Sequence, residues 1–271
     1  MRAVLLSDPT TAQFISREFV ASWECVRAVP QVTIDFGNGK VLHRTIAGNT
    51  VLYICMPDGR VVDALPGIYT PGAFKVEAAK ALAVIRTLQN PGADVEYGTA
   101  LGAWHKRQVG EAILSEKRRI TFSKAMVESP LLKALGLMPG SGIREPAVAT
   151  ANTWEGPVLP NMDLASAFAS VTSRLEDISH QSATAVQTRR KILPNGQPGD
   201  LSPEELGKIA VELDSTNNIR VVRPAVHMLL AMSVARRFPS DLRDTIYKQI
   251  LRIAIDDPML GLADARVPGT L

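Results

Sequence analysis

Two cysteines are the side chains of this chain with the clearest capacity for nucleophilic or redox chemistry. Cys25 lies in the sequence SWECVR, where the charge of Arg27 would favour a reactive thiolate and that of Glu24 would oppose it. A reactive Cys25 would make the chain a single-thiol redox enzyme or sensor, and the alternative is a structural cysteine at the edge of a strand. Cys55 ends the apolar run VLYIC and is expected in the core.

Two of the four histidines, His180 and His227, are candidate metal ligands. Glu176 and His180 are four residues apart, so on a helix they would share one face and could bind a metal or form an ion pair. His227 lies in the sequence RPAVHMLLA, within an apolar helix, and His105 in AWHKRQ is expected to be a solvated position. The spacing of the histidines and cysteines fits no zinc motif. We therefore predict no cofactor, with a metal or haem site that uses Cys25, His180 or His227 kept as an alternative.

The composition narrows the classes of function. The chain has 271 residues, of which 46% are apolar, and this is enough for one large domain or two modest ones. Its 30 basic and 27 acidic residues give a net charge of +3, too even a balance to predict nucleic acid as a partner. No apolar run reaches the ~18 residues that a membrane-spanning helix needs, and the apolar run 3–6 is too short for a signal peptide. We expect a soluble, cytoplasmic protein.

One hairpin followed by a helix is the stretch around which the other elements are arranged. Residues 51–55 predict a strand, the Pro-Asp-Gly sequence at 57–59 a tight turn, and residues 60–65 a returning strand. Pro71 then provides a typical first helical residue, and the good helix formers of 73–88 predict the helix itself.

The remaining elements are predicted from capping residues, alternating apolar patterns and breaks. We predict helices over 9–18, 98–135 (as one helix or two), 164–193, 203 to about 213, 224–237 and 242–255, and strands over 19–23, 32–36 and 41–46. The polar run 214–218 is expected to end the helix before it. A domain boundary is placed between 92 and 98, and residues 139–161, rich in proline and glycine, are expected to form a long loop.

Several short motifs of the first ninety residues carry a resemblance to a known superfamily. They are Ser7-Asp8-Pro9, Phe14-Ile15, Phe19-Val20, Pro57-Asp58-Gly59 and Gly67-Ile68-Tyr69-Thr70-Pro71. In this order they resemble the thioredoxin-like superfamily, in its branch of thiol–disulfide interchange domains, over about a third of the chain. The chain departs from that family at the redox centre. No C-x-x-C precedes the first helix, and Gly48-Asn49-Thr50 stands where the family has a cis-proline.

The sequence therefore predicts an α+β fold, with a truncated thioredoxin-like sheet-and-helix domain over residues 1–92 and a helical domain over residues 98–271. Because the chain lacks the reactive pair of the family that it resembles, we expect it to be non-catalytic. The first hypothesis is an interaction or scaffold protein within a larger assembly, with a protein partner or a second copy of the chain. The alternatives stay open: a single-thiol protein that uses Cys25, or a metal- or haem-binding protein.

Overall fold

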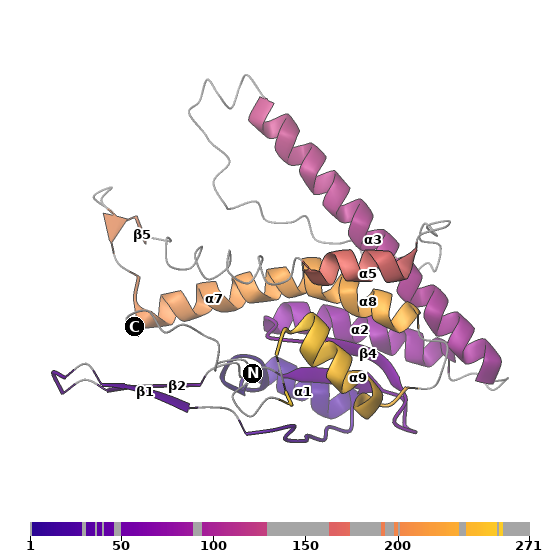
Figure 1. Ribbon diagram of the computed structural model, residues 1–271, viewed down its shortest axis with the longest axis horizontal. Helices are drawn as coiled ribbons and strands as arrows, with labels where there is room; N and C mark the ends of the chain where they lie inside the picture. The colour runs from indigo at the N-terminus through magenta and orange to yellow at the C-terminus, as the bar shows by residue number, and fades with distance from the viewer. Residues whose placement is uncertain are drawn as a thin grey trace.

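The computed structural model describes the main helices of the chain and three pairs of strands (Figure 1). The described residues are 2–28, 31–35, 37–39, 41–45, 50–88, 94–128, 163–173, 191–192, 198–199, 201–232, 237–253 and 255–256. The predicted loop 139–161 lies outside them, as do Glu176 and His180 and most of the second half of the helix predicted over 164–193.

The fold is α+β and mostly helical, as predicted at that level. The α-helices are α1 (Pro9–Glu18), α2 (Pro71–Leu88), α3 (Asp94–Glu128), α5 (Leu164–Ser173), α7 (Pro203–Asn217), α8 (Arg223–Ala231) and α9 (Pro239–Thr245). Short π-helical segments are η1 (Arg2–Leu6), η2 (Asn218–Val222) and η3 (Ile246–Ile250). The strands are β1 (Gln31–Asp35), β2 (Val41–Thr45), β3 (Val51–Cys55), β4 (Val61–Pro66), β5 (Lys191–Ile192) and β6 (Pro198–Gly199). No helix in these ranges is long and apolar enough to cross a membrane.

The predicted central hairpin is present. Strands β3 and β4 pair antiparallel, with Tyr53 opposite Ala64. The turn between them closes with a 2.9 Å hydrogen bond from the amide of Gly59 to the carbonyl of Met56, and Gly59 takes a φ of +87° that favours glycine. Helix α2 begins at Pro71 and packs its apolar face against β4, as the sequence predicts.

Each sheet in the described part of the chain has two strands, in the orders β1-β2, β3-β4 and β5-β6. The wider sheet that a thioredoxin-like domain implies is therefore not observed among these residues, and the resemblance stays a prediction. The predicted hairpin of strands 32–36 and 41–46 is found as β1 and β2, which pair with Ile34 opposite Leu42.

Residues 19–23 do not form the buried strand that their apolar run predicts. Phe19 ends α1 in an extended conformation, and its ring meets that of Phe14 at 5.9 Å between ring centroids. Beyond Phe19, residues 20–28 form no helix or strand, and Val20 is fully exposed and Trp23 82% exposed. An apolar run becomes a strand only if a neighbouring strand forms hydrogen bonds with it, and residues 19–23 pair with no strand in the described part of the chain.

The polar run 214–218 does not end a helix, contrary to prediction. Helix α7 runs on through η2 into α8. Two of its polar side chains bind the hairpin exit instead: Ser215 Oγ accepts a hydrogen bond from the amide of Thr70 (3.1 Å), and Asn218 Nδ2 donates to the carbonyl of Ile68 (2.8 Å). The contact is close, because a Cβ on Gly67 would lie 2.6 Å from Asn218 Nδ2.

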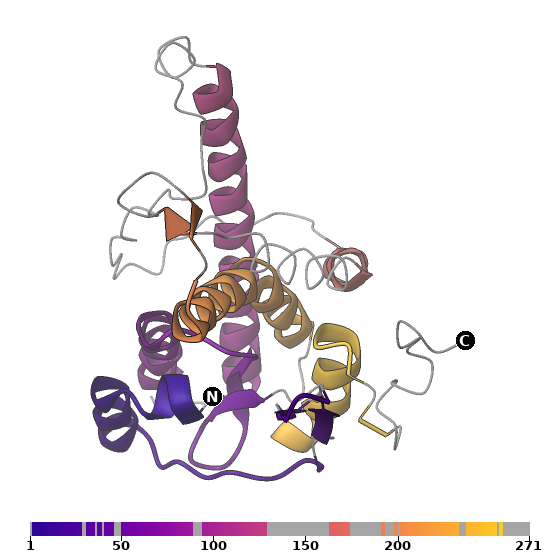
Figure 2. The same cartoon turned by 90° about the vertical axis from the view of Figure 1, so that its left-hand side faces the viewer.

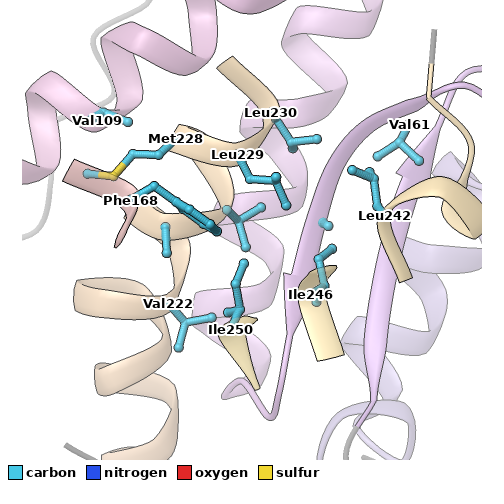
Figure 3. Packing of buried hydrophobic residues seen from close by; sticks show 13 residues of the cluster. Val61, Val109, Phe168, Val222, Met228, Leu229, Leu230, Leu242, Ile246 and Ile250 are labelled. Atoms are coloured by element: carbon cyan, nitrogen blue, oxygen red, sulfur yellow. The ribbon is translucent and has the colours of Figure 1, made fainter. Parts of the chain in front are cut away.

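Two apolar clusters hold these elements together. The first, between β4 and the C-terminal helices, consists of Val61, Ala64, Val109, Phe168, Val222, Ala225, Val226, Met228, Leu229, Leu230, Leu242, Ile246 and Ile250 (Figure 3). The second, between the hairpin and α2, consists of Leu5, Ile54, Val62, Leu65, Tyr69, Phe74, Ala78, Ala81, Val84, Ile85 and Trp104. Both clusters include residues from either side of the predicted 92–98 boundary, so residues of the two predicted domains share these cores; the boundary itself stays a prediction.

Helix α3 has two parts with different surroundings. Trp104, His105 and Val109 of its N-terminal part are buried, and this part packs against α2 and α8. Its C-terminal part extends away from the other helices (Figure 2). The predicted 98–135 segment is thus one helix as far as Glu128, and it brings a histidine into the core.

Candidate functional site

Five ionisable side chains are buried together where the hairpin meets the helices. They come from four elements: Asp63 from β4, Glu77 from α2, His105 from α3, and Arg223 and His227 from α8. We call them the buried polar cluster. Arg223 and His227 are four residues apart, so one face of α8 presents both.

An ion-pair network forms one side of the buried polar cluster. The guanidinium of Arg223 donates to both carboxylate oxygens of Asp63, from Nη1 at 2.7 Å and from Nη2 at 2.6 Å. It also donates from Nε to Glu77 Oε2 at 3.1 Å and from Nη1 to the carbonyl of Ala64 at 2.7 Å. Lys80, at the edge of the network, donates to the other oxygen of Glu77 at 2.7 Å. The two-point contact with Asp63 is the geometry in which guanidinium recognises a carboxylate most strongly.

The charges of this network are mutually dependent. Burial raises the pKa of Asp63, and the charge and hydrogen bonds of Arg223 oppose that shift. Burial also acts to raise the pKa of Glu77, but Arg223 and Lys80 outweigh it, so that this pKa is lowered. Burial acts to lower the pKa of Arg223, and the two carboxylates outweigh it and raise this pKa. Two carboxylates therefore share one guanidinium, and Lys80 balances the remaining negative charge from the protein surface.

A hydrogen-bonded pair of imidazoles forms the other side of the cluster. His105 Nε2 lies 3.1 Å from the carbonyl of Val62, and because a carbonyl only accepts, Nε2 carries the hydrogen. In the neutral ring, His105 Nδ1 is then an acceptor, and His227 Nδ1 at 2.8 Å donates to it. Burial lowers the pKa of His105 to about 3 and that of His227 well below its ordinary value, with Arg223 adding to both shifts. Both rings are therefore neutral at pH 7, and the ring of Trp104 packs edge-on against them.

The cluster contains a set of donor atoms that metals bind. Asp63, His105 and His227 each offer one ligand atom, and these atoms lie within 4.8 Å of one another. Two imidazoles and one carboxylate suit zinc and its neighbours in the first transition series. Next to the network lies Tyr69, whose fully buried hydroxyl has no hydrogen-bond partner among the described residues.

The predicted site residues are placed very differently from one another. Cys25 is exposed and lies in no strand, so its prediction as a strand-edge cysteine is wrong; its Sγ donates to the carbonyl of Arg27 at 3.3 Å. His227 is buried in α8 and joins His105 rather than Cys25. Cys55 is half-buried beside the first apolar cluster, and burial raises the pKa of its thiol to about 11.

His105 is not a solvated position, contrary to prediction, because it is completely buried. The local sequence AWHKRQ reads as polar, but Trp104 and Val109 mark the face of α3 that packs inward, and His105 lies on it. Sequence reasoning also missed Asp63 and Arg223. The sequence does contain a signal for both residues, because each is a single charge next to apolar residues, in VVDALP and RPAVHMLLA. A charge that is buried with such neighbours needs a partner of opposite charge.

Comparison of this chain with protein-family models, with curated proteins and with solved structures finds no match. Function must therefore be inferred from the chemistry and exposure of its own residues.

Proposed function

We propose that this chain is a non-catalytic protein-contact module, built on a truncated thioredoxin-like hairpin and helix. Two features support this proposal. The first is the order of β3, the Pro-Asp-Gly turn, β4 and α2, and the second is the absence of a C-x-x-C pair from the sequence. The chain has two cysteines, thirty positions apart, of which Cys25 is exposed and Cys55 half-buried with a raised pKa. Dithiol exchange needs two neighbouring thiols that can form a disulfide, and Cys25 and Cys55 are both free thiols outside any C-x-x-C sequence.

The observation that carries the proposal is the exposed apolar segment 20–26. Val20 is fully exposed, Trp23 is 82% exposed and Val26 is 37% exposed. Single exposed apolar residues are ordinary, but three large ones within one segment of seven residues are a feature of contact surfaces. Tryptophan in particular is enriched among the residues that contribute most to protein–protein binding. The segment therefore resembles one half of an interface.

The buried polar cluster supports the non-catalytic part of the proposal. Its charged groups bind one another rather than projecting into solvent, and Asp63 and His105 have no exposed surface. A network of this kind fixes how packed elements are oriented, whereas a catalytic group must reach a substrate. The cluster thus gives a rigid body on which a contact segment is displayed.

The partner that we propose is a second copy of the chain, because two-fold dimers are the commonest assembly of soluble proteins. Light scattering after gel filtration, over a hundredfold range of protein concentration, measures the mass in solution. Trp23→Ala should weaken the dimer by about 30-fold in Kd, the effect of truncating a residue worth about 2 kcal/mol. Val76→Ala, which shortens an exposed apolar side chain on α2, is the control and should leave the dimer unchanged. A monomer at every concentration, or equal behaviour of the two variants, would contradict the proposal.

A further inference from the structure

We propose that Asp63, His105 and His227 form an internal binding site for one divalent ion of the zinc class. The ion would lie between the two imidazoles, in place of the hydrogen that they now share. This inference does not depend on the contact function of segment 20–26, because it uses none of those residues.

The geometry of the imidazole pair is close to that of a metal site. The facing Nδ1 atoms of His105 and His227 are 2.8 Å apart. Two nitrogens bound to a tetrahedral zinc at about 2.05 Å would be about 3.3 Å apart, so the rings need to separate by only about half an ångström. A ligand atom of Asp63 already lies within 4.8 Å of the ligand atoms of both histidines.

The second ring nitrogen of His105 has the partner expected of a metal ligand. Histidines that bind metals through one nitrogen usually donate the other N–H to a carboxylate or a backbone carbonyl, which fixes the tautomer. His105 Nε2 makes this bond to the carbonyl of Val62. Its Nδ1 therefore presents a lone pair to the site without any rearrangement of that ring.

The charge and proton balance of the site also permits the ion. His227 stays neutral on binding: its hydrogen leaves Nδ1 and an equivalent one is taken up at Nε2, so no net proton is released. Asp63 and Glu77 carry two negative charges, of which Arg223 offsets one within the core and Lys80 the other from the surface. The counter-charge next to the ion is therefore the carboxylate of Asp63, which the ion would share with Arg223. Oδ1 of Asp63 already accepts from Arg223 and from the amide of Ala64. Oδ2 accepts only from Arg223, so its second lone pair can bind the ion while Arg223 stays in place.

A buried hydroxyl next to the cluster lacks a partner. Tyr69 is fully buried, feels the charges of Arg223, Glu77 and Asp63, and makes no hydrogen bond within the described residues. A buried polar group without a protein partner is commonly bonded to a water molecule. Three protein ligands leave a fourth position on a zinc-class ion, and a water bound there is one such partner.

The test uses the full chain, stripped with a chelator and refolded from denaturant with Co²⁺ or Zn²⁺, so that burial of the site cannot block entry. We expect one ion per chain by elemental analysis, a ligand-field spectrum typical of tetrahedral Co²⁺, and a higher melting temperature with Zn²⁺. His105→Gln and His227→Gln should each weaken Co²⁺ binding at least about tenfold. His43→Gln, which removes a histidine on β2 outside the cluster, should not change it.

Circular dichroism of each variant separates loss of the site from loss of the fold. If one histidine variant does not fold, the other histidine variant in the same assay provides the second measurement. A folded wild-type chain that takes up no ion at 100-fold excess would overturn the proposal. Binding that is equally strong in the His105→Gln and His227→Gln variants would overturn it as well, because the ion would then be held elsewhere.

Discussion

Arg223 is the residue whose replacement tests the buried polar cluster most directly. Replacing it with methionine keeps most of the side-chain volume in α8 and removes the charge. Asp63, fully buried, would then lose both of its charge-assisted hydrogen bonds, and Glu77 would keep only Lys80. Removal of one member of a buried ion pair typically destabilises a protein by about 3–5 kcal/mol, because the other charge is left without a partner.

The bonds lost set the upper limit of this effect. Arg223 makes two hydrogen bonds to Asp63, one to Glu77 and one to Ala64. At about 1.5–3 kcal/mol for each bond to a charged group, their sum would approach the whole stability of a typical protein. Protonation of Asp63 relieves part of this loss, since burial already favours the neutral acid. We therefore expect Arg223→Met to lower the free energy of unfolding by about 3–5 kcal/mol rather than the full sum.

A double-mutant cycle separates the ion pair from general damage to the core. Asp63→Asn should also destabilise strongly, because Glu77 is then the one carboxylate that remains to the buried guanidinium in the cluster. The combination of Asp63→Asn with Arg223→Met removes both charges, so its effect should fall short of the sum of the single effects by about 2 kcal/mol or more. Urea unfolding at pH 7, followed by circular dichroism, gives all four stabilities.

The control is Lys208→Ala, which breaks a fully exposed ion pair with Glu204 on α7 and should give no resolvable change. A loss below about 1 kcal/mol for Arg223→Met, or additive effects in the cycle, would show that the ion pair does not stabilise the fold.

Two further predictions concern the cysteines and the histidine pair. At pH 8 a thiol reagent should label Cys25 rapidly and Cys55 slowly, because a thiol of pKa about 11 is only about 0.1% ionised there. Cys25→Ser should abolish the rapid phase, and two equally rapid phases in the native protein would refute the placement of Cys55. In chelator-treated protein, the free energy of unfolding should be highest above pH 6.5 and should decrease as the pH falls below it. In the unfolded chain the two histidines, with a pKa of about 6.5, bind protons in this range, whereas His105 and His227 in the folded protein stay neutral because their pKa values are lowered. Two such groups predict a loss of about 2–3 kcal/mol by pH 5.5 in urea unfolding, and His105→Gln should roughly halve the dependence on pH over that range.

The elements that the sequence predicts well are those set by neighbouring residues. Asp8 accepts a hydrogen bond from the amide of Thr11 at the start of α1, and Ser202 forms a reciprocal capping box with Glu205 at the start of α7. The Pro-Asp-Gly turn closes β3 on β4 in the same way. Each of these signals needs only a few adjacent residues, so the sequence contains the whole interaction.

The predictions that fail depend on residues far away in the chain. Asn218 belongs to a polar run of the kind that usually ends a helix. Its side-chain amide instead donates a hydrogen bond to the carbonyl of Ile68, 150 positions away, and the helix continues. His105 reads as a solvated residue because its partners Val62 and His227 are 43 and 122 positions distant. The pattern of neighbouring residues predicts whether an element is a helix or a strand. It does not predict which polar group of a distant element will form a hydrogen bond with it.

The buried polar cluster makes the packing of α8 against the hairpin specific in a way that its apolar residues do not. α8 is buried along its whole length, so apolar contacts alone would tolerate several rotations of this helix. A shift by one residue turns a helix by about 100° and would carry Arg223 away from Asp63, leaving both charges buried and unpaired. The same shift would separate His227 from His105. The four elements are thus held in one arrangement because other rotations of α8 would leave buried charges unpaired. This arrangement also brings the proposed metal ligands together.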